Sequence, residues 1–240
     1  KEISLLTLIV DEKDFISDSK VEIIQKKDIN HLKNVYRYKK GDYVRLIDGI
    51  NEYLSQIDEI ENKKISLNII EKKEDNYSLS AKIDIALGVL KNDKMNMALQ
   101  KLTEIGINKI IPLKTERVIV KLDDSKEKWK VIIEEALKQC RGVKIPEIDK
   151  ITLLKNIEYL NYDKVFFAYE NSCEDKSIFE LLTGEEKNIL YFIGPEGGFT
   201  KEETEYLREQ GAVEISLGKR IYRAETAAVV IGGILANVYK

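Results

Sequence analysis

The chain contains few of the residues that build metal centres and disulfide frameworks. Its 240 residues include two cysteines, Cys140 and Cys173, and one histidine, His31. Two cysteines cannot form the several bridges of a small disulfide-stabilised scaffold. Together with a single histidine they are also too few for the usual zinc-ligand spacings. The sequence therefore predicts neither a bound metal ion nor a disulfide framework.

Long hydrophobic runs are also missing. No apolar stretch reaches the roughly 18 residues that a membrane span needs. Near the N-terminus, acidic residues directly follow the short apolar run Leu5–Val10, which is not the layout of a signal peptide. The sequence predicts a cytoplasmic chain without a membrane segment.

The chain also lacks a net positive charge. It has 39 basic and 42 acidic residues, a formal net charge of −3, whereas nucleic-acid-binding domains often have a pI above about 9. The charges are unevenly distributed, however, because seven lysines and arginines but only two aspartates lie between Lys26 and Arg45. This basic segment is either a solvated lysine-rich face or a surface that contacts phosphate groups.

The first 75 residues have the pattern of a small β-barrel-like domain. Apolar residues make up 43% of the whole chain and charged residues 34%, which allows a buried core and one or two domains. One helix is predicted over Asp28–Tyr38, with Asp28 as its N-cap. The polar string at residues 72–76 predicts a boundary between a domain of residues 1–75 and a domain of residues 76–240. The strands predicted for the first domain are Ile3–Val10, Tyr43–Asp48, Glu52–Ile60 and Lys64–Glu71.

From Leu79 onward, strand-like runs alternate with helical patterns. This alternation predicts βαβ units and an α/β domain with a mostly parallel sheet. The predicted strands are Ala81–Val89, Lys109–Leu113, Lys164–Tyr169, Asn188–Ile193 and Val213–Leu217, and the predicted helices are Asp93–Ile105, Asp124–Arg141, Thr200–Gln210 and Ala224–Tyr239.

A glycine-rich loop follows the most apolar of these strands. The run Ile189–Ile193 continues into Gly-Pro-Glu-Gly-Gly-Phe-Thr at residues 194–200, and Thr200 with Glu203 has the spacing of a helix capping box. Such a loop lies at the carboxyl edge of a parallel sheet, where ligands bind. It matches neither the Walker A nor the G-x-G-x-x-G pattern. The loop therefore either binds another kind of ligand or is a turn without one.

A second strand also ends in a glycine and leads into an apolar helix. Arg223 and Glu225 lie at the start of that helix, just before the small and apolar run Ala227–Leu235. Charged groups entering such a run are costly unless they are paired or used. The pair is either a helix cap with a surface arginine or part of a site, and the nearby glycine-rich loop favours a pocket shared by both loops.

The two loops resemble those of the RsmE family of 16S ribosomal RNA (uracil-N3) methyltransferases, which belong to the SPOUT superfamily. The loops carry the sequences I-G-P-E-G-G-F and L-G-K-R-I-Y-R-A-E-T-A. In this sequence Tyr222 and Ala224 stand where the family commonly has leucine and threonine. Further matching segments, in the family's order, are His31–Arg37, Lys40–Gly49, Gln100–Gly106, Ile111–Arg117 and Ile145–Ile148.

The resemblance implies a fold, a cofactor and partners. It implies a PUA-like RNA-binding domain, then a SPOUT domain with a C-terminal trefoil knot, S-adenosylmethionine as cofactor, a homodimer, and 16S rRNA of the 30S subunit as substrate. The cofactor-binding residues that it implies are Phe167, Ala168, Tyr169, Ile193, Gly194, Pro195, Glu196, Gly197, Gly198, Ser216, Leu217, Gly218, Ile221, Tyr222, Arg223, Thr226 and Ala227. The RNA-binding residues are expected to be Lys33, Arg37, Lys39, Lys40 and Arg117.

The chemistry of the implied reaction suggests roles for the two charged residues. N3 of uridine carries a proton at neutral pH, so methylation requires that the negative charge developing on the uracil be stabilised. The hypothesis is that Arg223 supplies this cation and Glu225 orients it; in a second version Glu225 accepts the proton. Two other functions stay open: methylation of another RNA position such as a ribose 2′-hydroxyl, or a non-catalytic role in RNA binding or ribosome assembly.

Overall fold

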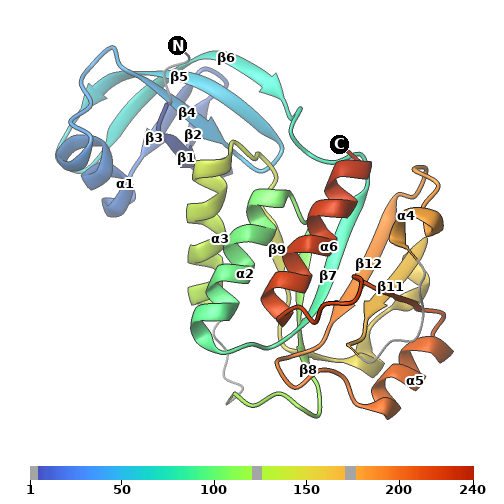
Figure 1. Cartoon of the computed structure of the whole chain (residues 1–240). Coiled ribbons are helices and arrows are strands. Elements are labelled where there is room, and N and C mark those ends of the chain that lie inside the picture. Colours follow the sequence, from blue (N-terminus) through green and yellow to red (C-terminus); the bar gives the residue numbers. More distant parts are fainter. Residues whose placement is uncertain (1–4, 121–125, 171–176) are drawn as a thin grey trace. The chain divides into compact units, whose positions relative to one another are not determined.

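A computed structural model of the chain describes residues 5–120, 126–170 and 177–240, except the side chain of Lys126. The chain divides into two compact units (Figure 1). The first ends at Ser78 and also includes Leu137–Ile145, and the second comprises Leu79–Ala136 and Pro146–Lys240. Within the described residues, no helix is long and apolar enough to cross a membrane. The same residues contain no group of three or more His, Cys, Asp or Glu side chains placed to hold a metal ion, and Cys173 lies outside them.

The first unit is built on a six-stranded sheet with the order β1-β4-β5-β6-β3-β2. Strand β1 pairs with β4 in parallel, and the other neighbouring strands are antiparallel. Apolar residues that alternate along the strands, such as Val44 and Leu46, form the buried core. The elements are β1 (Thr7–Ile9), β2 (Phe15–Ser17), β3 (Lys20–Ile23), α1 (Lys26–Asn30), β4 (Tyr43–Ile47), β5 (Asn51–Ile60) and β6 (Ile65–Glu74).

The helix predicted over Asp28–Tyr38 is shorter and begins earlier. Helix α1 ends at Asn30 and continues as one π-helical turn over His31–Val35. The prediction that Asp28 is the N-cap is wrong, because Gln25 holds that position. Asp28 is instead buried inside the helix, where its carboxylate lies 3.4 Å from the amine of Lys138.

The end of helix α3 (Lys126–Cys140) and the loop after it pack in the first unit. Leu137 and Val143 form an apolar cluster with Ile47 of β4. The Arg45 guanidinium donates hydrogen bonds to Glu52 at 2.7 Å and to the Arg141 carbonyl at 2.9 Å. Hydrophobic periodicity predicts a domain boundary near residue 75. It does not predict these contacts, because they join segments that are almost 100 residues apart in the chain.

The second unit contains a parallel sheet with the order β10-β8-β7-β12-β11-β13, and β9 pairs with β8. Every pairing in it is parallel, which confirms the predicted α/β class. The elements are β7 (Lys82–Gly88), α2 (Asn92–Ile105), β8 (Lys109–Lys114), α3, β9 (Glu147–Ile148), β10 (Thr152–Leu153), β11 (Lys164–Ala168), α4 (Ile178–Leu181), β12 (Asn188–Ile193), α5 (Lys201–Glu209), β13 (Val213–Ile215) and α6 (Ala224–Val238).

Helices cover both faces of this sheet (Figure 1). Along β12, Leu190 and Phe192 point to the face that packs against Leu207 of α5. Tyr191 points to the opposite face, where its hydroxyl donates a 2.9 Å hydrogen bond to the Ala228 carbonyl of α6. A Cβ at Gly232 would lie 2.8 Å from the Tyr191 hydroxyl oxygen, so glycine is needed for this close approach of α6 to the sheet.

Candidate functional site

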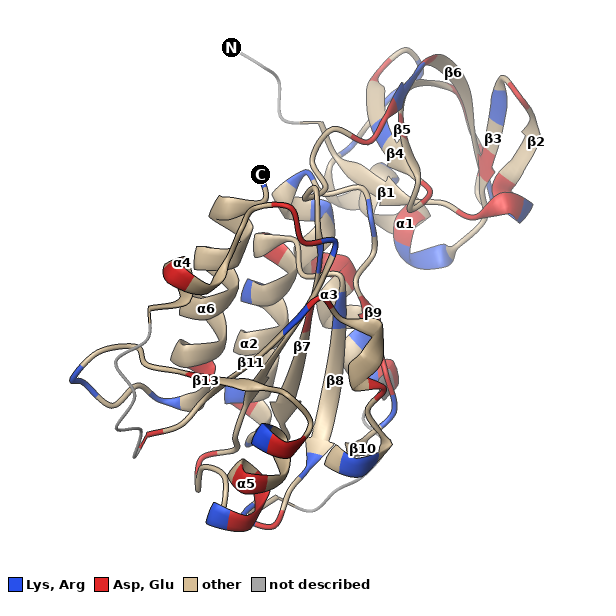
Figure 2. Ribbon diagram, turned by 90° about the vertical axis from the view of Figure 1, so that its right-hand side faces the viewer, with Lys and Arg blue, Asp and Glu red and all other residues tan. Residues whose placement is uncertain are grey.

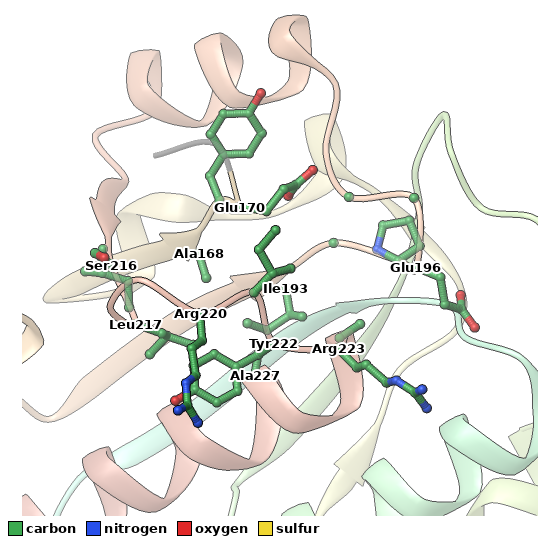
Figure 3. A pocket seen from close by; sticks show the side chains of 18 of the residues that line it. Ala168, Glu170, Ile193, Glu196, Ser216, Leu217, Arg220, Tyr222, Arg223 and Ala227 are labelled. Atoms are coloured by element: carbon green, nitrogen blue, oxygen red, sulfur yellow. The ribbon is translucent and has the colours of Figure 1, made fainter. Parts of the chain in front are cut away.

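The two loops singled out in the sequence enclose one cavity of about 530 Å³ at the carboxyl edge of the parallel sheet (Figure 3). The ends of β11, β12 and β13 and the start of α6 meet there, because parallel strands end at a common edge. The residues of the cavity wall that the resemblance had pointed to are Ala168, Tyr169, Ile193, Gly194, Pro195, Glu196, Gly197, Gly198, Ser216, Leu217, Gly218, Ile221, Tyr222, Arg223 and Ala227.

Two residues expected at the cofactor do not line this cavity. Phe167 is buried on the other face of β11, in the cluster that includes Leu207, because side chains alternate along a strand. Thr226 is exposed to solvent, whereas the next residue, Ala227, faces the cavity. Successive residues of a helix point about 100° apart, so adjacent positions rarely share a wall.

Sequence reasoning missed six residues of the cavity wall. Glu170 is the second residue after the end of β11, so the rule that ligands bind at strand ends could have found it. Lys94 comes from α2, which is distant in sequence, and no local pattern points to it. The six residues are Lys94, Glu170, Ile215, Lys219, Arg220 and Ala224.

The glycine-rich loop is packed closely against its neighbours. A Cβ at Gly88, the last residue of β7, would lie 2.4 Å from the Pro195 nitrogen. Gly198 has a φ of +68°, in the left-handed region that favours glycine. The Thr200 hydroxyl and the Glu203 carboxylate form the predicted capping box at the start of α5.

Polar side chains hold the glycine-rich loop in place. The Arg117 guanidinium donates hydrogen bonds to the carbonyls of Gly197 at 3.1 Å and Phe199 at 3.2 Å. Glu196 Oε1 accepts a 3.1 Å hydrogen bond from the Lys91 backbone N–H, and the Lys94 amine lies 3.7 Å away. Arg117, expected at the RNA, is therefore observed as a support of the glycine-rich loop.

The two charged residues at the start of α6 lie in different surroundings. Arg223 is exposed on the cavity wall, and Figure 3 shows its side chain extending on the side of Glu196, away from Ser216 and Leu217. Glu225 is 4% exposed and does not line the cavity. Its Oε2 has no hydrogen-bond partner among the described residues, and within them it forms no ion pair with Arg223. The geometry thus places the Arg223 guanidinium at the cavity. In the described part of the chain, no hydrogen bond or ion pair lets Glu225 orient it.

The basic segment lies in the first unit and its side chains are largely exposed. The Lys33 amine donates a 2.8 Å hydrogen bond to Asn62, and the Lys40 amine lies 3.4 Å from the Asp58 carboxylate. Arg37 has a φ of +56° and an exposed side chain, and Lys39 is also exposed. Arg45, at the end of the segment, is instead occupied with Glu52 and the Arg141 carbonyl.

Comparisons with known proteins agree with this architecture. Residues 77–236 match the RNA methyltransferase domain family, and residues 24–70 match the RNA methyltransferase PUA domain family. The chain is 33% identical over 231 residues to ribosomal RNA small subunit methyltransferase E of Bacillus subtilis, covering 90% of this chain and 89% of that protein. The enzyme of the same name from Rickettsia conorii is 33% identical over 215 residues, which cover 88% and 87% of the two chains.

Solved structures show the same fold over almost the whole chain. A Legionella pneumophila protein determined in complex with S-adenosylmethionine has a TM-score of 0.86 and 26% identity, with 98% of each chain covered. Small subunit methyltransferase E of Neisseria gonorrhoeae has a TM-score of 0.85 at 23% identity, again with 98% of each chain covered. The chain therefore belongs to the ribosomal RNA small subunit methyltransferase E family.

Proposed function

We propose that this protein transfers a methyl group from S-adenosylmethionine to N3 of a uridine in 16S rRNA. The proposal rests mainly on one observation: the glycine-rich loop and the loop before α6 line the same cavity. Those are the loops through which the chain resembles the family. Relatives with 33% identity over about nine-tenths of the chain are named as small-subunit rRNA methyltransferases, and a structural neighbour was determined with S-adenosylmethionine bound.

The cavity suits this cofactor in size and chemistry. Its volume of about 530 Å³ lies in the usual range for small-molecule sites. Ile221 is 81% exposed on the cavity wall, so an adenine ring packed there would remove apolar surface from water. Glu196 Oε2 is buried and has no donor among the described residues, so it can accept a hydrogen bond from a ligand hydroxyl or ammonium.

When bound, S-adenosylmethionine supplies the methyl group on a sulfonium ion. The residues of the chain enclose it and prepare the acceptor. Arg223 places a guanidinium at the cavity, where it stabilises the negative charge that develops on the uracil carbonyls as N3 loses its proton to solvent water. Glu225 lies at the positive end of the α6 dipole, and in this account it supports the start of the helix rather than touching the base.

The proposal also includes contacts with RNA and a second copy of the chain. The exposed cations Lys33, Arg37, Lys39 and Lys40 of the basic segment are suited to phosphate contacts. Helix α6 leaves Gly233 and Ile234 only half-buried, as expected of a helix that packs against a partner copy. The trefoil knot and the 30S particle as the substrate stay predictions from the resemblance.

Mass analysis of nucleosides tests the reaction. Unmethylated 30S particles are incubated with the protein and S-adenosylmethionine, digested to nucleosides and compared with a reaction without protein. The proposal predicts one new N3-methyluridine per particle. A ribose-methylated nucleoside would identify another target atom, and no methylation despite cofactor binding would favour a non-catalytic role in RNA binding or assembly.

A further inference from the structure

A second groove of about 470 Å³ lies in the second unit, next to the cofactor cavity. It is formed by the end of β8, by β10 with the turn after it, and by the start of α5. Figure 2 shows lysine and arginine residues near β10 and on α5. Its principal lining residues are Lys114, Thr115, Leu154, Lys155, Glu202 and Tyr206.

Thr115 lines this groove, and its hydroxyl is buried and unsatisfied. The residue is 8% exposed, and its Oγ1 has no hydrogen-bond partner among the described residues. A buried hydroxyl without a partner is costly and rare in folded proteins. The neighbouring Glu203 is different, since its carboxylate accepts hydrogen bonds from the backbone N–H groups of Glu116 and Thr200, both at 2.9 Å. Glu203, which also lines the groove, thus has hydrogen-bond partners, whereas the Thr115 hydroxyl has none among the described residues.

The rest of the groove combines a tyrosine ring, two lysines and the carboxylates of Glu116, Glu202 and Glu203. Glu203 is turned to the backbone N–H groups named above. Tyr206 is half-buried and held in place by the Tyr159 ring, whose centroid lies 6.2 Å from its own. The amines of Lys114 and Lys155 are exposed at the rim, and neither forms an ion pair within the described residues. A tyrosine ring, two lysines and a buried hydroxyl without a partner are groups that can contact the base, the phosphate and the sugar of one nucleotide of a single strand.

The groove and the cofactor cavity share one stretch of chain. Gly194–Gly198 line the cavity, and Thr200–Tyr206 contribute the α5 wall of the groove. Arg117 and Glu203 tie the segment after β8 to this stretch through the hydrogen bonds described above. We infer that the groove binds a nucleotide that flanks the target uridine, so that it fixes the position of the RNA strand beside the methyl donor. This inference rests on the proposed function.

Matched lysine variants test the phosphate contact. Lys114→Ala/Lys155→Ala removes two charges from the groove, and Lys150→Ala/Lys187→Ala removes two exposed charges outside it. The inference predicts that the groove variant raises the KM for 30S particles about ten-fold and lowers the slope of log KM against log salt by about 1 to 2. The control variant leaves both quantities near wild type. Equal behaviour of the two variants would overturn the inference.

Thr115→Val separates a ligand role from a structural one. Removal of an unsatisfied buried hydroxyl should leave the melting temperature unchanged or raise it. The inference predicts that the same variant nevertheless raises the KM for 30S particles several-fold, while S-adenosylhomocysteine binds as it does to wild type. A stable variant with an unchanged KM would overturn the ligand role of the hydroxyl.

Ultraviolet crosslinking identifies what occupies the groove. Crosslinks from the peptide that contains Tyr206 should lead to a nucleotide adjacent to the target uridine. Crosslinks to a ribosomal protein, or to distant RNA, would overturn the inference. If wild-type protein does not methylate 30S particles at all, the proposed function itself fails, and that result is distinct from methylation that ignores the groove variants.

Discussion

At the residue scale, the least expected finding concerns the two charges at the start of α6. The sequence predicts that Arg223 and Glu225 act together, whereas the structure exposes Arg223 at the cavity and buries Glu225 without contact between them in the described chain. The alternation of side chains along β11 would have excluded Phe167 from the cavity, and the helical spacing along α6 would have excluded Thr226. Lys94 could not have been found, because only the tertiary fold brings α2 to the glycine-rich loop.

Replacement of Arg223 by alanine tests its proposed role in catalysis. If the guanidinium acts on the uracil and not on the cofactor, as proposed, kcat should fall about 10²- to 10³-fold, and the Kd for S-adenosylhomocysteine should change less than about three-fold. Single-turnover methylation and calorimetry measure the two quantities. Arg220→Ala, which removes another arginine of the cavity wall, is the comparison. Equal losses in rate and cofactor affinity for Arg223→Ala would contradict the assignment.

Arg117 has two interpretations that make different predictions. As a support of the glycine-rich loop, its loss in Arg117→Ala frees the carbonyls of Gly197 and Phe199 and should weaken S-adenosylhomocysteine binding about ten-fold, since two charged hydrogen bonds are removed. If Arg117 only contacts RNA, Arg117→Ala should raise the KM for RNA and leave cofactor binding intact. Calorimetry on the variant without RNA distinguishes the two.

At the scale of elements, long periodic segments were predicted well and short ones were not. The predicted strand Asn188–Ile193 is confirmed residue for residue as β12, and the helix predicted from Ala224 begins there as α6. Strands β2, β3, β9 and β10 were missed because two to four residues carry too little periodicity. The π-helical turn after α1 was missed because its residues still show helical spacing.

Helix α6 is anchored at its end by a buried carboxylate. The Tyr239 hydroxyl donates a hydrogen bond to Glu186, and the Tyr239 carbonyl accepts one from the Ser80 backbone N–H at 2.7 Å. Burial would raise the pKa of Glu186, but hydrogen bonds from Tyr239 and from the Thr183 backbone outweigh burial and lower this pKa to about 2. Ionised Glu186 therefore stabilises the fold at neutral pH.

The stability should depend on pH in a defined direction. A carboxylate whose pKa is lowered by folding stabilises the protein above the ordinary value of 4.5, and this stabilisation is lost as pH falls towards 2. Tyr239→Phe should reduce the free energy of unfolding at pH 7 by about 1–3 kcal/mol and flatten the pH dependence below 4.5. Denaturant unfolding at several pH values measures the free energy of unfolding and its pH dependence, with Tyr43→Phe as a control at an exposed tyrosine. An unchanged pH profile in Tyr239→Phe would contradict the anchoring role.

In the molecule as a whole, the two units present different chemistry. The first unit presents the exposed cations of the basic segment, and the second holds the cavity. Periodicity predicts a boundary near residue 75, and the resemblance pointed to the family. The place of Leu137–Ile145 in the first unit had no signal in the sequence. The net charge of −3 does not reveal the basic segment, which only the order of the residues shows.

Removal of basic side chains should change the salt dependence of RNA binding. Each phosphate contact contributes about 0.7–0.9 to the slope of log affinity against log salt. Arg37→Ala/Lys39→Ala should therefore lower the slope by about 1 to 2 without changing S-adenosylhomocysteine binding. Filter binding of 30S particles at several salt concentrations measures the slope, and an unchanged value would remove the basic segment from the RNA interface.

The most direct test of the account is calorimetric titration of the protein with S-adenosylhomocysteine. Gly218 and Gly211 have φ values of +93° and +83°, and a Cβ at either would meet nothing within 4 Å, but only Gly218 lines the cavity. Valine at each position should therefore impose a similar backbone strain. Wild-type protein and Gly211→Val should both show saturable binding, and Gly218→Val should bind at least about ten-fold more weakly. No binding to folded wild-type protein, or equal binding to both variants, would contradict the proposed cofactor site.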